Sequence, residues 1–217
     1  MTIIISVLSQ KGGAGKSTIS RLLAVEAARL GKRIKIADLD LTQATSVSWN
    51  NRRMQAKRQP AVEAQTFGAV AQALRDAASF DLMVIDGAPS ASRAALEAAK
   101  ASVLTIIPTR PSLDDLRPAL AFARDLERNG IAPDRIVFVL NQTTDSQAEI
   151  NDARASLEKA GFPMAEAVIP YKTGYSRALD DGAAPSEARH PALQGKAQTV
   201  ASELFAYLRT LEGAETW

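Results

Sequence analysis

The segment SQKGGAGKST at residues 9–18 constrains the fold of this chain more than any other feature, because it lies between an apolar run and an alanine-rich segment of helical period. Its glycines let the backbone turn tightly and point successive N–H groups inward. A helix predicted to begin near Lys16 adds the positive end of its dipole. A strand, loop and helix of this kind form a nest for phosphate oxygens, the P-loop pattern. The other interpretation is a glycine-rich turn before a helix, but the Gly-Lys-Ser-Thr ending favours phosphate binding.

The rest of the chain alternates continuous β-branched runs with longer segments rich in alanine and leucine. This alternation is typical of parallel strands that crossover helices bury on both faces. We therefore predict an α/β fold, a doubly wound and mostly parallel sheet with helices on both faces, as a single domain over residues 1–217. The predicted strands are residues 2–8, 33–38, 61–66, 82–86, 103–107, 135–140 and 167–169. The predicted helices are residues 16–30, 45–57, 68–79, 91–100, 112–129, 146–160 and 192–211.

Composition excludes several kinds of chemistry. The chain contains no cysteine, which excludes disulfides, thiolate metal sites and a cysteine nucleophile. His190 is the only histidine, so there is no catalytic triad and no histidine metal site. The net charge of +2 is too small to support nucleic-acid binding except through a local patch. No stretch approaches the roughly 18 apolar residues that span a bilayer, so we expect a cytoplasmic protein without membrane association.

Within a P-loop, each residue type has a defined task. Lys16 would reach the β- and γ-phosphates of a nucleotide, and Ser17 would supply a hydroxyl group to Mg²⁺. The strict pattern has a glycine at position 10, where this chain has Gln10, and a second lysine, Lys11, stands at the entrance of the loop. The residues predicted to bind the phosphates are Lys11, Gly12, Gly13, Ala14, Gly15, Lys16, Ser17 and Thr18.

Three carboxylates follow the predicted strands at the places where ligands bind in doubly wound sheets. Asp38 ends one strand and Asp40 comes two residues later, so both should lie beside the phosphate loop. Asp38 would alternatively be a turn former at the strand end. Asp86 ends the apolar run LMVID, the form of a segment whose carboxylate holds Mg²⁺ through water.

These elements together resemble the ParA/MinD group of partition ATPases over nearly the whole chain. The loop KGGAGKST is similar to their deviant Walker A loop, and the resemblance implies that Lys11 reaches across a nucleotide-sandwiched dimer to the partner's phosphates. The alternative interpretation is that Lys11 is a solvated lysine of the loop. The family's Asp-x-Asp-Pro-Gln segment implies that Asp40 orients the attacking water. Here Leu41 and Thr42 replace the single proline, which puts Gln43 one residue out of step.

Further stretches extend the resemblance. The segment PTRPSLDD at residues 108–115 is similar to one near the family's dimer face, and Ser112 should cap the helix that follows it. Asn141 matches an asparagine that contacts adenine in relatives, although an asparagine at a turn is the alternative. Pro170 falls where relatives surround the base with backbone.

Two sets of basic residues are candidates for contact with DNA. Arg52, Arg53, Lys57 and Arg58 lie close together, and Arg53 and Lys57 should share one helical face. A solvated helix face is the more frequent explanation for charges of this density. The second set lies in the region where relatives bind DNA nonspecifically and consists of Arg177, Arg189, Lys196 and Arg209. The helix predicted at residues 192–211 lacks the basic face of a membrane-surface helix, so we expect it to dock on the sheet.

The resemblance implies an ATPase that binds ATP and Mg²⁺, dimerises and coats nonspecific DNA of the nucleoid in order to position plasmid or chromosome cargo. Lys11, Lys16 and Asp40 would be its catalytic residues, and Ser17, Asp40 and Asp86 would serve the metal. A ParB-type centromere-binding protein would stimulate it. Because the first strand is predicted to begin at residue 2, we expect the small type without an added helix-turn-helix domain. The alternatives are a MinD-like membrane-associated ATPase and a metabolic ligase or kinase.

Overall fold

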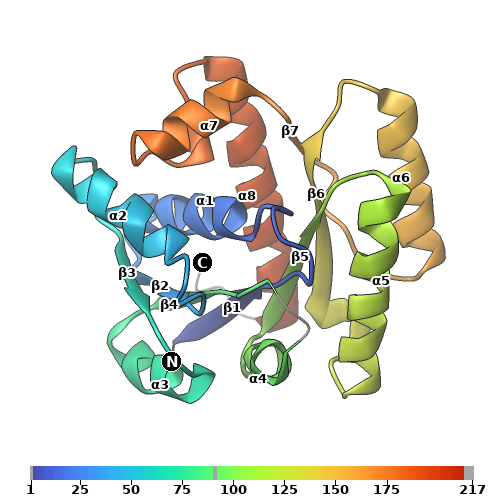
Figure 1. Cartoon of the computed structure of the whole chain (residues 1–217), viewed down its shortest axis with the longest axis horizontal. Coiled ribbons are helices and arrows are strands. Elements are labelled where there is room, and N and C mark those ends of the chain that lie inside the picture. Colours follow the sequence, from blue (N-terminus) through green and yellow to red (C-terminus); the bar gives the residue numbers. More distant parts are fainter. Residues whose placement is uncertain (1, 90–91, 213–217) are drawn as a thin grey trace.

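The computed structural model describes residues 2–89 and 92–212, and within them a seven-stranded sheet forms the centre of the molecule (Figure 1). All of its strand pairs are parallel, in the order β3-β2-β4-β1-β5-β6-β7. The strands are β1 (Ile3–Val7), β2 (Ile34–Asp38), β3 (Glu63–Thr66), β4 (Leu82–Asp86), β5 (Leu104–Thr109), β6 (Ile136–Thr143) and β7 (Ile169–Pro170). The predicted α/β fold is confirmed, and each predicted strand is present with its ends shifted by at most three residues.

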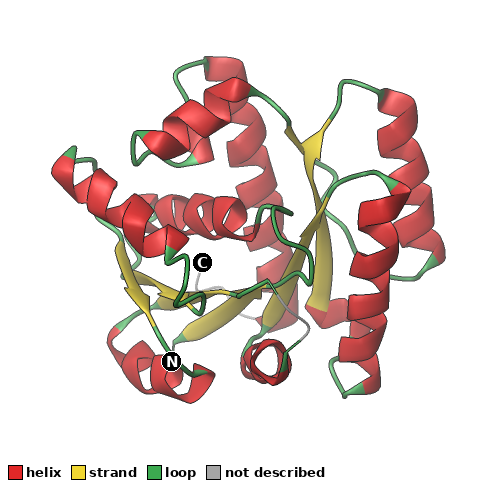
Figure 2. Cartoon of the chain, viewed as in Figure 1, coloured by secondary structure: helices red, strands yellow, loops and turns green. Residues whose placement is uncertain are grey.

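Helices cover both faces of the sheet (Figure 2). They are α1 (Lys16–Arg29), α2 (Thr45–Gln55), α3 (Val70–Asp76), α4 (Arg93–Ala101), α5 (Leu113–Arg128), α6 (Gln147–Lys159), α7 (Thr173–Asp180) and α8 (Pro191–Glu212). Short 3₁₀ turns lie at η1 (Ala77–Ser79), η2 (Pro133–Arg135) and η3 (Pro185–Glu187). The seven predicted helices are present. Residue 91, where one was predicted to begin, lies outside the described residues.

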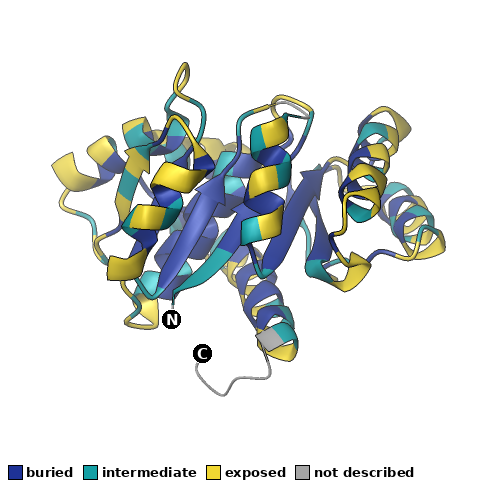
Figure 3. Cartoon of the chain, turned by 90° about the horizontal axis from the view of Figure 1, so that it is seen from below, coloured by how far each residue is buried: buried dark blue, intermediate teal, exposed yellow. Residues whose placement is uncertain are grey.

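The central strands are largely apolar because each face of the sheet meets a separate layer of helices, whereas the edge strand β3, with the sequence EAQT, is partly exposed. In β1, Ile5 and Val7 belong to a core cluster shared with α1, α2, α7 and α8. Ile4 packs against a second cluster, shared with α3, α4, α5 and α6. Successive side chains of a strand point to opposite faces, so a largely apolar run is what a doubly covered sheet favours. Figure 3 shows the buried sheet between helices whose outer surfaces are exposed.

Helix α7 was not predicted, because its sequence TGYSRALD contains glycine, threonine and serine within eight residues. Such a short helix depends on packing rather than on intrinsic propensity. Tyr175 supplies much of that packing: its ring is buried, and its hydroxyl donates a hydrogen bond to the carbonyl oxygen of Leu193, 2.8 Å away. Packing of Tyr175 against α8 therefore stabilises α7.

The sheet register brings the ends of three strands together. Val7 of β1 pairs with Asp86 of β4, and Asp38 of β2 pairs with the same residue from the other side. The carboxyl ends of parallel strands lie on one edge of a sheet, which is where doubly wound proteins bind ligands. The loop that follows β1 therefore emerges beside both strand-end carboxylates.

Candidate nucleotide-binding site

The loop between β1 and α1 adopts a backbone that only glycine accommodates at two positions. Gly13 and Gly15 have positive φ angles of 75° and 103°, a region that side chains disfavour. A Cβ atom on Gly15 would also lie 1.8 Å from the Nδ2 atom of Asn141. These glycines permit the tight turn at the start of α1 that the P-loop interpretation predicted.

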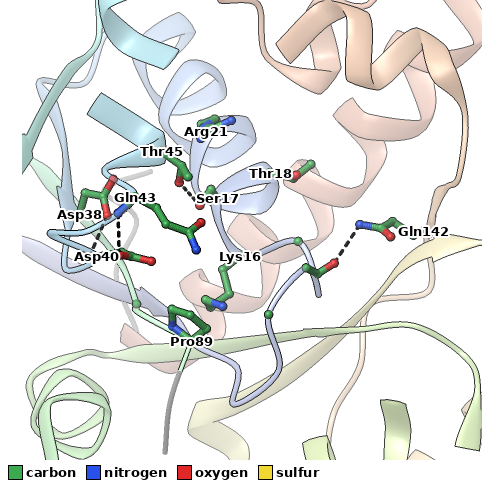
Figure 4. A pocket seen from close by; sticks show the side chains of 14 residues that line it. Lys16, Ser17, Thr18, Arg21, Asp38, Asp40, Gln43, Thr45, Pro89 and Gln142 are labelled. Atoms are coloured by element: carbon green, nitrogen blue, oxygen red, sulfur yellow. Dashed lines mark hydrogen bonds between the residues drawn. The ribbon is translucent and has the colours of Figure 1, made fainter. Parts of the chain in front are cut away.

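A cavity of about 290 Å³ lies in front of this loop (Figure 4). Its walls include most of the predicted phosphate-binding residues, namely Gly12, Gly13, Gly15, Lys16, Ser17 and Thr18, together with Asp38, Asp40 and Gln43. The predicted catalytic residues Lys16 and Asp40 therefore face one space. Two backbone N–H groups of its own loop, those of Thr42 and Gln43, donate hydrogen bonds to the carboxylate of Asp40.

Lys16 places a positive charge inside the cavity. Its side chain extends between the loop and Asp40 (Figure 4), and its Nζ atom lies 3.5 Å from the carbonyl oxygen of Lys11. Burial lowers the pKa of Lys16, while the charges of Asp86 and Asp40 oppose that change. A desolvated ammonium group without a full counter-ion is suited to meet phosphate oxygens.

Asp86 does not line the cavity; it ends β4, opposite Asp38 of β2, and is almost completely buried. The hydroxyl of Ser46 donates a hydrogen bond to its Oδ2 atom at 2.6 Å, whereas its Oδ1 atom is buried and has no hydrogen-bond partner among the described residues. Burial raises the pKa of Asp86 to about 6; the charge of Asp38 adds to this rise, and the hydroxyls of Ser46 and Ser17 oppose it. A cation near this carboxylate would favour its charged form.

The residues present fit a magnesium-nucleotide complex. The described residues contain no group of three or more histidine, cysteine or acidic side chains that would hold a metal unaided. Magnesium in nucleotide sites takes few protein ligands and is completed by phosphate oxygens and water. Two oxygen atoms here are of the type that magnesium prefers as ligands. They are the unpartnered Oδ1 of Asp86 and the hydroxyl oxygen of Ser17, which lies 2.8 Å from Thr45 Oγ1.

Lys11 lies at the entrance of the loop and is engaged within its own chain. Its Nζ atom is 2.6 Å from Oδ1 of Asp115 and 3.4 Å from the carbonyl oxygen of Asp114. Ser112 holds the other oxygen of Asp115 through a 2.6 Å hydrogen bond. The predicted contact of Lys11 with a partner's phosphates stays a prediction.

Asn141 and Pro170 were predicted to contact the adenine, and neither lines the cavity formed by the described residues. The side chain of Asn141 is buried beneath the loop, where its amide donates a hydrogen bond to the carbonyl oxygen of Ala14 at 2.8 Å. Its neighbour Gln142 does line the cavity and donates to the carbonyl oxygen of Gly13 at 3.1 Å. Adenine contact by Asn141 and Pro170 stays a prediction.

Sequence reasoning missed Ser46, Gln142 and Arg21. Arg21 lines the cavity, and its Nε atom donates a hydrogen bond to the Ser46 hydroxyl at 3.3 Å. Its position, four residues after Ser17 on the same face of α1, was a signal that would have revealed it. Ser46 carried no such signal, because its contact with β4 exists only in the folded chain.

Arg53 corrects the interpretation of the first basic set. Its side chain is 1% exposed, and it donates hydrogen bonds to the carboxylate of Glu187, at 2.6 Å, and to the carbonyl oxygen of Pro60. Lys57 does not share its helical face, because α2 ends at Gln55 and Lys57 has a φ of 51°. Arg53 is therefore neither solvated nor available to DNA in this structure.

Members of both basic sets nevertheless meet at a second cavity, of about 410 Å³. Arg58 comes from the first set, Arg177 and Arg189 come from the second, and His190 completes this side of the wall. We call these four residues the arginine cavity. The opposing charge is small, because Glu187 is paired with Arg53 and Arg29, and Asp181, 3.7 Å from Arg189, is the one other acidic residue among the described residues that line this cavity.

Helix α8 docks on the sheet as predicted. Val200, Leu204 and Leu208 are buried in the cluster that also contains α1. No helix in the described part of the chain is long and apolar enough to cross a bilayer.

Comparisons with known proteins agree with this geometry. The family model described as CbiA, the CobQ/CobB/MinD/ParA nucleotide binding domain, matches residues 5–185. The chain is 27% identical over 183 residues to maintenance of carboxysome distribution protein A of Gloeobacter kilaueensis, with 82% of both proteins covered. It is 26% identical over 188 residues to Protein ParA of Rhizobium radiobacter, covering 82% of this chain and 83% of the relative.

Solved structures share the fold at lower identity. The septum site-determining protein MinD of Pyrococcus horikoshii, complexed with Mg-ADP, superimposes with a TM-score of 0.70 at 20% identity, over 94% of this chain and 96% of that one. The family model alone covers well over half of the sequence. The chain therefore belongs to the CobQ/CobB/MinD/ParA nucleotide-binding domain family and is an ATPase of its ParA/MinD group.

Proposed function

We propose that this protein binds ATP with Mg²⁺ in the cavity before the P-loop, dimerises in that state, binds DNA nonspecifically and is released by hydrolysis. The observation that carries the proposal is the arrangement of Lys16, Ser17 and Asp40 around one cavity, together with the buried Asp86 at the end of β4. The Mg-ADP complex of the related MinD supports the choice of ligands. The cargo would be a plasmid or chromosome.

The chemistry is one of positioning and charge stabilisation, without a covalent intermediate. N–H groups of the glycine-rich loop and the charge of Lys16 would hold the phosphates, and Asp40 would orient the attacking water in line with the γ-phosphoryl group. Ser17 and Asp86 would hold the magnesium ion, which supplies charge neutralisation at the phosphate oxygens when bound.

Dimerisation would recruit Lys11 to the site of the other subunit. In the single chain this lysine is paired with Asp115, and 46% of its side chain is exposed. The pairing would have to be exchanged for phosphate contacts when two nucleotide-loaded subunits meet. Although the Asp115 side chain is only 10% exposed, the lysine end of the pair is open to solvent, so the pair contributes about 1 kcal/mol and the exchange is energetically accessible.

The arginine cavity is the surface that we assign to DNA. Phosphate contacts by arginine provide sequence-independent affinity, and they do not require a large net charge on the whole protein. Arg177 and Arg189 lie in the region where the family resemblance places nonspecific DNA binding, and Arg58 adds a third guanidinium group from the loop between α2 and β3. A ParB-type protein bound at a centromere-like site would then act as the stimulator of hydrolysis.

Co-sedimentation of the purified chain with random duplex DNA and with anionic liposomes, each with and without Mg-ATP, tests the proposal. We expect binding to DNA only, and only with ATP. ATP-dependent binding to liposomes would instead identify a MinD-like membrane role. Formation of a phosphorylated small molecule in place of simple ATP turnover would identify a ligase or kinase.

A charge-reversal variant sharpens the DNA arm of this experiment. Arg177→Glu combined with Arg189→Glu should abolish DNA binding while ATP turnover persists, and the salt dependence of any residual binding should fall by about one unit per lost contact. Arg128→Glu, at the exposed end of α5, is the matched control. Equal loss of DNA binding in the control would contradict a localised DNA surface.

A further inference from the structure

Ser46 occupies a position at which three charged side chains of the site converge. It is the second residue of α2, immediately after the loop that carries Asp40, and it is completely buried. Its backbone N–H donates a hydrogen bond to Oδ2 of Asp38 at 2.9 Å. Its hydroxyl accepts a hydrogen bond from Nε of Arg21 at 3.3 Å and donates one to Oδ2 of Asp86 at 2.6 Å.

The bond to Asp86 determines which of the two carboxylate oxygens remains available. A hydroxyl that donates to a carboxylate at 2.6 Å forms a short, charge-assisted hydrogen bond. It occupies Oδ2 and leaves Oδ1 buried and without a hydrogen-bond partner among the described residues. The last torsion of an aspartate side chain is broad, so the orientation of this carboxylate depends on such a contact rather than on rotamer preference.

The same hydroxyl separates Asp86 from Arg21. Because Ser46 accepts from the guanidinium group and donates to the carboxylate, it stands between two opposite charges that are both buried. Without the hydroxyl, the buried Oδ2 atom would lose its donor, and Arg21, which donates to the same hydroxyl, would be a cation able to replace it. A direct pair with Arg21 would change the orientation of the carboxylate.

We propose that Ser46 is a positioning residue that orients the carboxylate of Asp86 and thereby sets the magnesium affinity of the nucleotide-loaded site. This inference depends on the proposed function, since it assumes that Asp86 serves a magnesium ion bound with ATP. Groups that hydrogen-bond to metal-side carboxylates commonly change metal affinity by 10–100-fold when removed. The residue reaches Asp86 from α2, so the loop containing Asp40 and the metal-side carboxylate are joined through one hydroxyl.

The test is a magnesium titration of nucleotide binding by the full chain, with a fluorescent ATP analogue as the probe. Ser46→Ala should raise the magnesium concentration for half-maximal binding about 10-fold, and it should leave the affinity measured in EDTA within about twofold of the parent. Electron paramagnetic resonance of Mn²⁺ in the presence of ADP should show a matching loss of bound metal. Ser48→Ala, at an exposed position of the same helix, should behave like the parent in both measurements.

The possible outcomes distinguish this inference from the proposed function. If the parent binds no ATP analogue with magnesium, the proposed function fails. If the parent binds and Ser46→Ala has the same magnesium dependence, the positioning role is wrong and the function stands. If Ser46→Ala loses affinity equally with magnesium and with EDTA, Ser46 only supports the fold of the site, and the inference is overturned.

Discussion

The ammonium group of Lys11 and the carboxylate of Asp115 lie 2.6 Å apart although 104 positions separate them in the chain. Partial burial alone would raise the pKa of Asp115, but hydrogen bonds from Lys11 and Ser112 outweigh it, and the pKa lies below its usual range. The loop entrance is thereby tied to the first turn of α5. In the single chain, the lysine that we propose to act on a partner's nucleotide is instead paired with Asp115 of its own subunit.

Removing that contact should favour the dimer. We expect Asp115→Asn to tighten ATP-dependent dimerisation by about two- to fivefold for each of the two pairs that must be broken, because an ion pair whose lysine is half exposed contributes about 1 kcal/mol at most. Analytical ultracentrifugation with a nonhydrolysable ATP analogue measures the effect, with Lys11→Ala as the variant that should not dimerise. A weaker dimer in Asp115→Asn would mean that Asp115 acts across the interface instead.

Lys16→Met should reduce ATP turnover without reducing the stability of the fold. We expect ATP turnover to fall at least about 100-fold, since the variant lacks the charge that would stabilise the transferred phosphoryl group. Burial lowers the pKa of Lys16, so the folded chain already disfavours the charged lysine. Replacing it should leave the melting temperature unchanged or raise it by about 2–4 °C, as a scanning calorimeter would detect. A large fall in melting temperature would show that the ammonium group stabilises the fold.

Arg53→Ala should destabilise the protein strongly. Removal of one partner from a buried ion pair costs about 3–5 kcal/mol. We expect a loss at the lower end of that range, because Arg29 still lies 3.6 Å from the carboxylate of Glu187. Urea denaturation followed by circular dichroism measures the free energy of unfolding. Arg52→Ala, from the neighbouring and more exposed residue, should cost less than about 1 kcal/mol. Comparable losses in the two variants would argue against a special role for the Arg53–Glu187 pair.

The burial of Tyr175 should make the stability of the protein fall at alkaline pH. Burial raises its pKa to about 12, so the folded state keeps the phenol neutral after the unfolded state has begun to ionise near pH 10. Its contribution to stability is therefore fully present below pH 10 and is lost progressively as the pH rises towards 12. Urea melts between pH 8 and 11.5 should show a steeper decline for the parent than for Tyr175→Phe. At pH 8 this variant should be about 1 kcal/mol less stable, since it lacks the hydrogen bond to Leu193. Parallel declines would contradict the prediction.

The parts of the site that the sequence predicted are those encoded locally. Gly13, Gly15, Lys16 and Ser17 act through backbone geometry and helix polarity within ten residues, so a short motif contains the whole physical argument. The same holds for the central strands, whose largely apolar runs follow directly from burial on both faces. Asp86 was found because it ends such a run.

What the sequence did not predict depends on contacts between distant segments. The interpretation of Arg53 was wrong because a charge pattern does not contain the partner, Glu187, that lies 134 residues further on. In the sequence, Ser46 is only a polar residue near the start of a helix. Its hydrogen bond to Asp86 exists only because folding places β4 beside it. Asn141 is similar: its position at a strand end was recognisable, whereas its burial beneath Ala14 follows from the close approach of Gly15.

The position of helix α2 depends on residues that come more than 120 positions later in the chain. Trp49 donates a hydrogen bond to the carbonyl oxygen of Ala183, and Arg53 is held by Gly182 and Glu187, so the helix is fixed by residues close to the C-terminal end of the described chain. A fragment that stops after β6 would contain every motif from the glycine-rich loop to Asn141 and would still lack the anchorage of Ser46. Nascent chains emerging from a ribosome pass through that truncated stage, so competence to bind nucleotide should arise late in synthesis, after the motifs themselves have been translated.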